Sequence, residues 1–162
     1  MPRILLAEDN GEMRQLLAGQ LRLAGYEVVE CRDGEQLVER LASTFLPTRN
    51  RHGFDLVVSD IRMPGFSGLE VLDGLHDCED FPPMILITAF GDQATHARAR
   101  LLGAAATLDK PFRIPELLAI VQRQIERRRR GWRTGATAAP SSLDITPPSP
   151  SDPHDNVNHE ED

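Results

Sequence analysis

Five polar side chains in this sequence follow or close short apolar runs, and their types suit phosphoryl chemistry. They are Glu8 and Asp9 after residues 4–7, Asp60 after 54–59, Thr88 at the end of 83–88, and Lys110 after 105–108. In an open α/β sheet, ligands bind outside the carboxyl ends of the strands. Three carboxylates, one hydroxyl and one ammonium at that edge predict a site for a metal ion and a phosphoryl group.

Each residue has a defined part in that chemistry. A carboxylate such as Asp60 becomes an acceptor only when the charge around it is neutralised. Mg²⁺ prefers hard oxygen ligands and relieves the repulsion among crowded acids. Lys110 supplies a second positive charge, and Thr88 supplies a short hydroxyl donor. Taken singly, all of them fit ordinary turn, helix-start, strand-end or surface roles. Only their joint placement favours the functional interpretation.

Strand-length runs alternate with runs of helical period along the chain. The predicted strands are residues 4–7, 26–31, 54–59, 83–88 and 104–108. Asn10, Asp33 and Ser67 are candidate helix N-caps, and Pro115 suits a first helical turn. Five successive β-α units predict an α/β fold with a doubly wound, five-stranded parallel sheet. The strand order 2-1-3-4-5, one known doubly wound order, would bring the three acids together.

Composition divides the chain into two parts. The 162 residues carry a formal charge of −7, which argues against general nucleic-acid binding. Residues 1–130 form the predicted domain, and residues 131–162, rich in Pro, Ser and acids, are predicted to be a disordered tail. The connection from Thr44 to Gly53 is unusually long. Cys31 and Cys78 are expected to be reduced, partly buried thiols of a cytoplasmic protein, and no run is long enough for a membrane span.

The sequence resembles the receiver domain of two-component response regulators. The matching segments are 4–10 (ILLAEDN), 55–68 (DLVVSDIRMPGFSG), 85–90 (ILITAF) and 108–112 (LDKPF), within a resemblance that covers about residues 3–127. It implies a (βα)5 flavodoxin-like fold with strand order 2-1-3-4-5. It also implies Asp60 as phosphoacceptor, Mg²⁺ bound by Glu8, Asp9, Asp60 and the main-chain carbonyl of Arg62, and Thr88 and Lys110 as phosphoryl ligands.

The resemblance further implies the partners and the output. A histidine kinase or a histidine phosphotransfer protein would donate the phosphate, and Thr88 would be a switch position. The second switch position is Thr107, where the family usually has Tyr or Phe. The output surface would be helix 92–102, strand 104–108 and the last helix, facing an unknown downstream protein. The chain is expected to be a stand-alone receiver with no DNA-binding domain. It is expected not to be an enzyme beyond adding phosphate to itself and removing it.

Other functions also fit parts of this residue pattern. A receiver-like interaction scaffold that is not controlled by phosphorylation is suggested by Thr107 and the long connection. An aspartate-nucleophile phosphatase would commonly have a second Asp two residues after Asp60, where Arg62 stands. A flavin site is disfavoured because three acids would repel an anionic cofactor. The arginines at 127–130 fit either a site for nucleic acid or an acidic partner, or a basic helix end favoured by the helix dipole, and the helix end is favoured.

Overall fold

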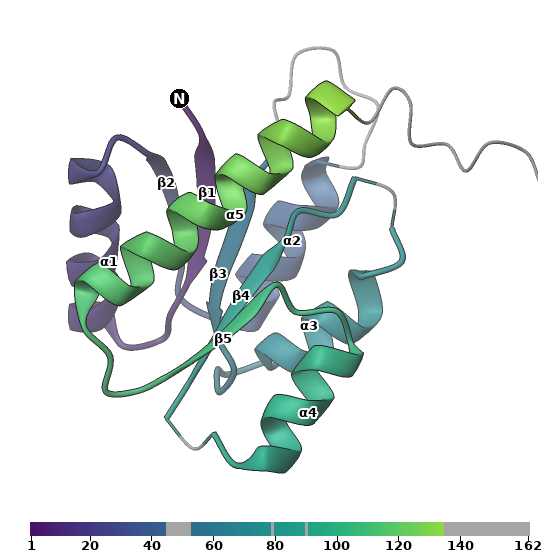
Figure 1. Ribbon diagram of the computed structural model, residues 1–162. Coiled ribbons are helices and arrows are strands. Elements are labelled where there is room, and N and C mark those ends of the chain that lie inside the picture. The colour runs from purple at the N-terminus through teal and green to yellow at the C-terminus, as the bar shows by residue number, and fades with distance from the viewer. Residues whose placement is uncertain (45–52, 79, 90, 135–162) are drawn as a thin grey trace, which may run out of the picture.

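The computed structural model describes residues 1–44, 53–78, 80–89 and 91–134 of the chain. Five strands alternate with five helices in this part (Figure 1). The elements are β1 Arg3–Ala7, α1 Gly11–Leu23, β2 Glu27–Cys31, α2 Gly34–Thr44, β3 Leu56–Asp60, α3 Gly68–Leu75, β4 Met84–Thr88, α4 Gln93–Leu101, β5 Ala106–Asp109 and α5 Ile114–Thr134. The strands are parallel in the order β2-β1-β3-β4-β5, which confirms the predicted fold class and strand order.

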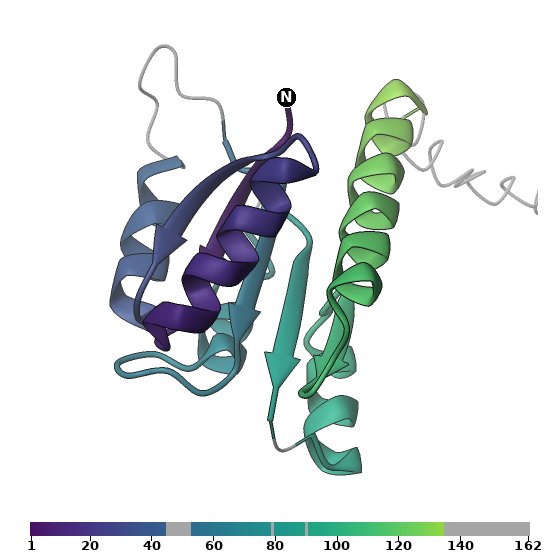
Figure 2. The same ribbon diagram turned by 90° about the vertical axis from the view of Figure 1, so that its left-hand side faces the viewer.

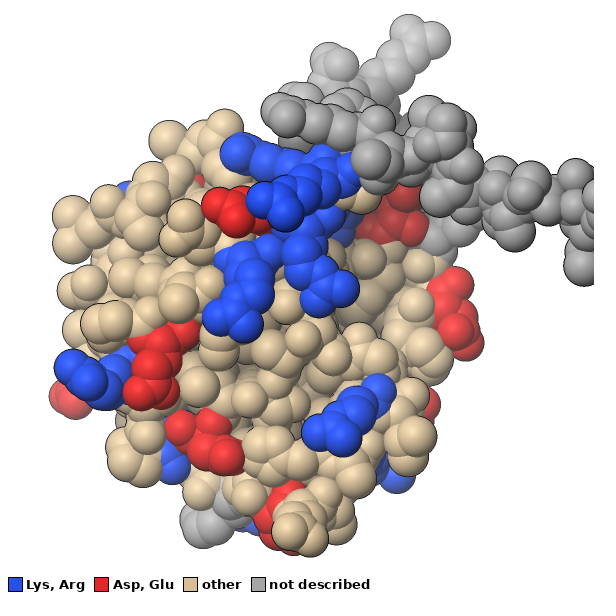
Figure 3. Space-filling view, viewed as in Figure 1, with Lys and Arg blue, Asp and Glu red and all other residues tan. Residues whose placement is uncertain are grey.

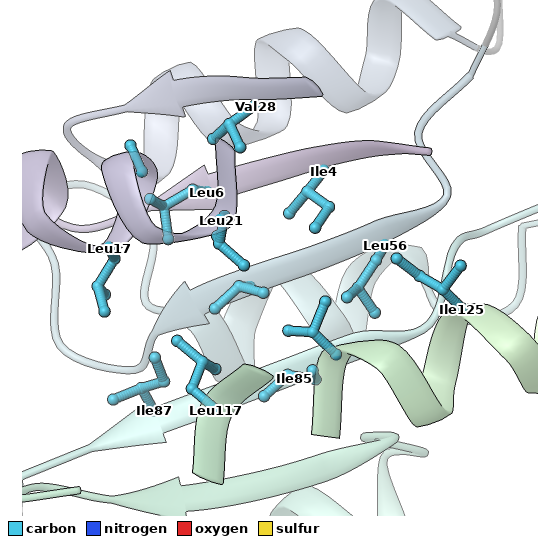
Figure 4. Close-up of a cluster of buried hydrophobic side chains, with 13 residues drawn as sticks. Ile4, Leu6, Leu17, Leu21, Val28, Leu56, Ile85, Ile87, Leu117 and Ile125 are labelled. Carbon is cyan, nitrogen blue, oxygen red and sulfur yellow. The ribbon is translucent and has the colours of Figure 1, made fainter. Parts of the chain in front are cut away.

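The sheet lies between two layers of helices (Figures 1 and 2). Side chains alternate between the faces of a strand, so successive residues of β1 and β3 enter different clusters. The first cluster packs α1 and α5 on one face, and Figure 4 shows its side chains meeting between strands and helices. The second cluster packs α2, α3 and α4 on the other face. β3 (LVVSD) and β4 (MILIT) are buried on both faces, and each is apolar up to the polar residues at its carboxyl end.

Local capping fixes where the helices begin. The Asn10 side chain accepts a hydrogen bond from the Met13 N–H at the start of α1, and Asp33 accepts one from the Gln36 N–H. Ser67 and Glu70 form a reciprocal capping box at α3. Pro115 lies in the first turn of α5. These four predictions from the sequence are therefore confirmed.

One glycine contact joins the loop after β3 to the start of α2. The Gly34 N–H donates to the Pro64 carbonyl at 3.1 Å. A Cβ at Gly34 would overlap the backbone of Phe66, so no larger residue fits without moving one of the two segments. The loop that follows Asp60 is thus held by α2 as well as by α3.

Four further expectations concern the tail, the long connection, the cysteines and membrane spans. α5 continues to Thr134, four residues past the predicted end of the domain at residue 130. The rest of the tail lies outside the described residues, as does 45–52 of the long connection. Cys31 is buried as a free thiol, whereas Cys78 is exposed rather than partly buried. None of the helices in the described part of the chain combines the length and hydropathy of a membrane span.

Candidate functional site

Two neighbouring strands bring the three predicted acids together. Glu8 and Asp9 directly follow β1, and Asp60 is the last residue of β3. One carboxylate oxygen from each residue lies within 4.8 Å of the others. Glu8 is 1% exposed and Asp60 6% exposed, whereas Asp9 is open to solvent. The cluster therefore has two buried carboxylates and one at its mouth.

Lys110 directly follows β5, the edge strand two positions from β3, and its side chain reaches this cluster. Its Nζ donates to Asp60 Oδ2 at 2.6 Å and to Glu8 Oε2 at 3.2 Å. Lys110 is also the only lysine in the chain, since every other basic residue among the 18 Lys and Arg is an arginine. That composition is a sequence signal that singles out this position. An ammonium is a compact point charge, so it can serve two carboxylates at once.

Two main-chain N–H groups and one arginine side chain complete the acid cluster. The Arg62 N–H donates to Asp60 Oδ1 at 3.1 Å, and the Asn10 N–H donates to Glu8 Oε1 at 3.2 Å. The Arg14 guanidinium bonds the Glu8 carbonyl at 2.9 Å. Arg14 lies one helical turn after the cap Asn10, and this spacing turns its side chain back toward the loop. Both buried carboxylates are thereby fixed in orientation.

The charges of the site act strongly on one another. Burial first, and the adjoining Asp60 carboxyl second, raise the pKa of Glu8 to about 7, although Lys110 and the Asn10 N–H act in the opposite direction. Partial burial alone would lower the pKa of Lys110, but its bonds to Asp60 and Glu8 outweigh this and raise it. A group of three acids around one ammonium is short of positive charge. It is therefore suited to a divalent cation.

The remaining predicted residues surround this centre. Thr88 is 3% exposed at the end of β4, and its carbonyl accepts from the Lys110 N–H at 2.8 Å. Arg62 and Asp9 line one shallow depression beside the acids. Thr107 is half-buried in β5 and alternates with Ala106 and Leu108, which pack against the first cluster. Its side chain therefore faces the α4 side of the sheet.

A further contact on that side was not predicted from the sequence. His96 Nε2 of α4 lies 2.8 Å from Asp109 Oδ1, and Asp109 is paired with Thr88 across β5 and β4. Gly91 runs so close to this pair and to Thr88 that an added Cβ would overlap all three. The pair links α4 directly to the strand end that carries Lys110.

Comparisons with known proteins identify relatives over most of the chain. The chain is 39% identical over 127 residues to the C4-dicarboxylate transport transcriptional regulatory protein DctD of Pseudomonas aeruginosa, covering 78% of this chain and 26% of that protein. It is 37% identical over 126 residues to the transcriptional regulatory protein PdtaR of Mycobacterium tuberculosis, covering 77% of this chain and 57% of the relative. The chain thus spans only part of the length of these relatives.

Solved structures show the same fold. The HemR receiver domain of Leptospira biflexa superposes with a TM-score of 0.65 at 30% identity, covering 77% of this chain and 94% of that domain. A CheY-like receiver domain protein of Methanospirillum hungatei gives 0.69 at 23% identity, covering 80% and 98%. Residues 4–122 match the response regulator receiver domain as a family. With the acids, the lysine and the strand order in place, the chain belongs to the response regulator receiver domain family, whose members serve two-component signalling.

Proposed function

We propose that this chain is a phosphorylation-controlled response regulator in which Asp60 accepts the phosphoryl group. The observation that carries the proposal is the convergence of the Glu8, Asp9 and Asp60 oxygens within 4.8 Å, beside an ammonium 2.6 Å from Asp60. The donor is a phosphohistidine of a histidine kinase or of a phosphotransfer protein. The Asp60 oxygen forms the new bond to phosphorus, the P–N bond breaks, and its electron pair returns to the imidazole.

The donor set fits Mg²⁺. Three carboxylates offer hard oxygens at one place, and the exposed Asp9 leaves the cluster open on one side. The residues that would hold the ion are Glu8, Asp9, Asp60 and the main-chain carbonyl of Arg62. When bound, Mg²⁺ supplies positive charge that stabilises the oxygens of the phosphoryl group.

The chain's own side chains do the rest of the work. Lys110 exchanges its bond to Asp60 for a bond to a phosphoryl oxygen, and the Thr88 hydroxyl donates to another. The Arg62 N–H orients the Asp60 carboxylate before the transfer. Pre-formed positions of this kind are the main requirement of phosphoryl transfer. The buried setting of Asp60 limits the access of water to the product.

The output is a change in partner binding, or onward transfer of the phosphate, biased by phosphorylation between two conformations. The surface proposed for a downstream protein consists of α4, β5 and α5. Ala94 and Ala97 of α4 are exposed and Thr107 of β5 is half-buried, so this surface has small side chains against which a partner can pack.

Intact-mass measurement tests the proposal. With acetyl phosphate or a cognate kinase and Mg²⁺, the chain should gain one acid-stable, base-labile phosphoryl group. Asp60→Asn should abolish it, and Asp73→Asn, an exposed aspartate of α3, should leave it intact. Labelling that persists in Asp60→Asn would place the acceptor elsewhere. Partner affinity unchanged by both Asp60→Asn and Lys110→Ala would identify a scaffold that does not depend on phosphate.

A further inference from the structure

The C-terminal half of α5 presents a surface of arginines that the phosphoryl site does not use. Figure 3 shows Lys and Arg side chains gathered over this part of the helix. We define the α5 arginine face by its exposed members: Arg123, Arg127, Arg129 and Arg130. Arg123, Arg127 and Arg130 follow the i, i+4, i+7 spacing that places side chains along one stripe of a helix. Arg128 is half-buried and lines a separate depression with Arg3 and Glu27.

The core fixes the direction in which this face points. Leu117, Val121 and Ile125 of α5 are buried in the first cluster. The Gln124 amide donates to the Ala105 carbonyl at 3.4 Å on the same side. The helix therefore cannot turn its arginines inward. Among the described residues, Arg123, Arg127 and Arg129 form no ion pair with a carboxylate.

The helix dipole does not account for Arg123 and Arg127. A cation is favoured by the dipole only within about the last turn of a helix. α5 ends at Thr134, so Arg123 lies roughly 16 Å before its end and Arg127 about two turns before it. Arg123 and Arg127 are also like charges four residues apart, which repel each other. An anionic group that covers the face would remove this repulsion.

The chain carries such a group directly after α5. Residues 135–162 contain six acids and no Lys or Arg: Asp144, Asp152, Asp155, Glu160, Glu161 and Asp162. Asp144 is ten residues beyond Thr134, and ten extended residues span roughly 33 Å, which is more than the length of the arginine face. Attachment to the same chain gives an effective concentration on the order of millimolar. A separate polyanion must compete with this attached acidic segment for the arginine face.

We infer that the acidic segment 135–162 binds the α5 arginine face of its own chain. The alternative occupant is nucleic acid, which is disfavoured because the whole chain carries −7. The contact covers the C-terminal half of α5 and weakens as salt rises, since it is made of exposed charges. It does not involve Asp60, so it stands or falls independently of the proposed function.

Paramagnetic relaxation on the full chain tests the contact. A nitroxide is attached at Ser151→Cys in a Cys78→Ser background, where the buried Cys31 is protected from the reagent. At about 50 mM salt, the amides of residues 123–130 should lose most of their intensity, and at about 500 mM they should recover. The variant Arg123→Gln, Arg127→Gln, Arg129→Gln should abolish the loss. The matched variant Arg98→Gln, Arg100→Gln, Arg113→Gln removes the same charge elsewhere and should retain it.

Two results would overturn the inference. The first is full intensity of the α5 amides at low salt, or the same loss in both triple variants. The second comes from labelled single-stranded DNA. Neutralising the six acids to Asn and Gln should free the face and tighten DNA binding by about tenfold. Equal DNA affinity of the parent and neutralised chains would show that the face is open and available to nucleic acid.

Discussion

The inner strands β1, β3 and β4 are more deeply buried than β5 and α4 at one edge of the sheet. All five residues of both β3 and β4 are buried, whereas the four residues of β5 are half-buried or exposed. α4 buries only Ala99. The acids thus lie on the rigid part of the molecule, while Thr107 and His96 lie on the part with little burial. Regions with few buried contacts open at lower free energy. We therefore expect the proposed phosphorylation of Asp60 to change the β5–α4 edge more than the inner strands.

A pair of leucine substitutions gives the largest expected contrast. Leu86→Ala in β4 removes a fully buried side chain and should lower the free energy of unfolding by about 3–4 kcal/mol. Leu101→Ala in α4 truncates a side chain that is 87% exposed and should change it by less than about 0.5 kcal/mol. Urea unfolding followed by circular dichroism measures both. Similar losses for the two variants would contradict the difference between these regions.

Lys110→Ala probes the point where the two regions meet. Removal of the ammonium leaves Asp60 and Glu8 buried without their shared partner. Because Lys110 is 22% exposed, we expect a loss at the low end of the range for broken buried pairs, about 3 kcal/mol. Mg²⁺ should restore more stability to this variant than to the parent chain, as thermal unfolding would show. Lys110→Arg, which keeps the charge, is the control, and an Ala variant as stable as Lys110→Arg would contradict the prediction.

The raised pKa of Glu8, which follows the inner strand β1, makes the free energy of unfolding and the affinity for Mg²⁺ depend on pH. In the metal-free chain Glu8 keeps its proton up to about pH 7 while the unfolded chain loses it near 4.5, so this group lowers the free energy of unfolding as pH rises between those values. Mg²⁺ requires the deprotonated carboxylate. Its affinity should therefore be about tenfold weaker at pH 6 than at pH 8 in calorimetric titrations. Glu8→Gln should flatten this profile, and an equally steep profile in that variant would assign the titration to another group.

The smallest effect is expected from the His96–Asp109 contact. Both side chains are partly exposed, so His96→Ala should cost less than about 1 kcal/mol of global stability. The same change should speed amide hydrogen exchange in α4 while exchange in β3 and β4 stays unchanged. Arg98→Ala, an exposed α4 substitution without this contact, is the control. Equal acceleration in both variants would show that His96 does not fasten α4 to β5.

The sequence predictions succeeded for features set by neighbouring residues and failed for a contact between separate elements. Buried strands appear as apolar runs and caps as local motifs, so both were predicted from residues close in sequence. The His96–Asp109 contact depends on how α4 packs against β5, across 13 residues, and no local pattern encodes it. The composition of residues 131–162 predicted a tail that starts at Gly131, whereas α5 continues to Thr134. An exposed helix tolerates a glycine at about 1 kcal/mol when hydrogen bonds continue beyond it.

The hydrogen bond between Gly34 and Pro64 also indicates where the chain should tolerate inserted residues. The bond to Pro64 is made by the first residue of α2, Gly34, ten residues before the helix ends at Thr44. Gly53 precedes the amino end of β3, whereas Asp60 lies at the carboxyl end of the same strand. We therefore expect tags or reporter peptides inserted between Thr44 and Gly53 to leave the cluster of Glu8, Asp9, Asp60 and Lys110 intact.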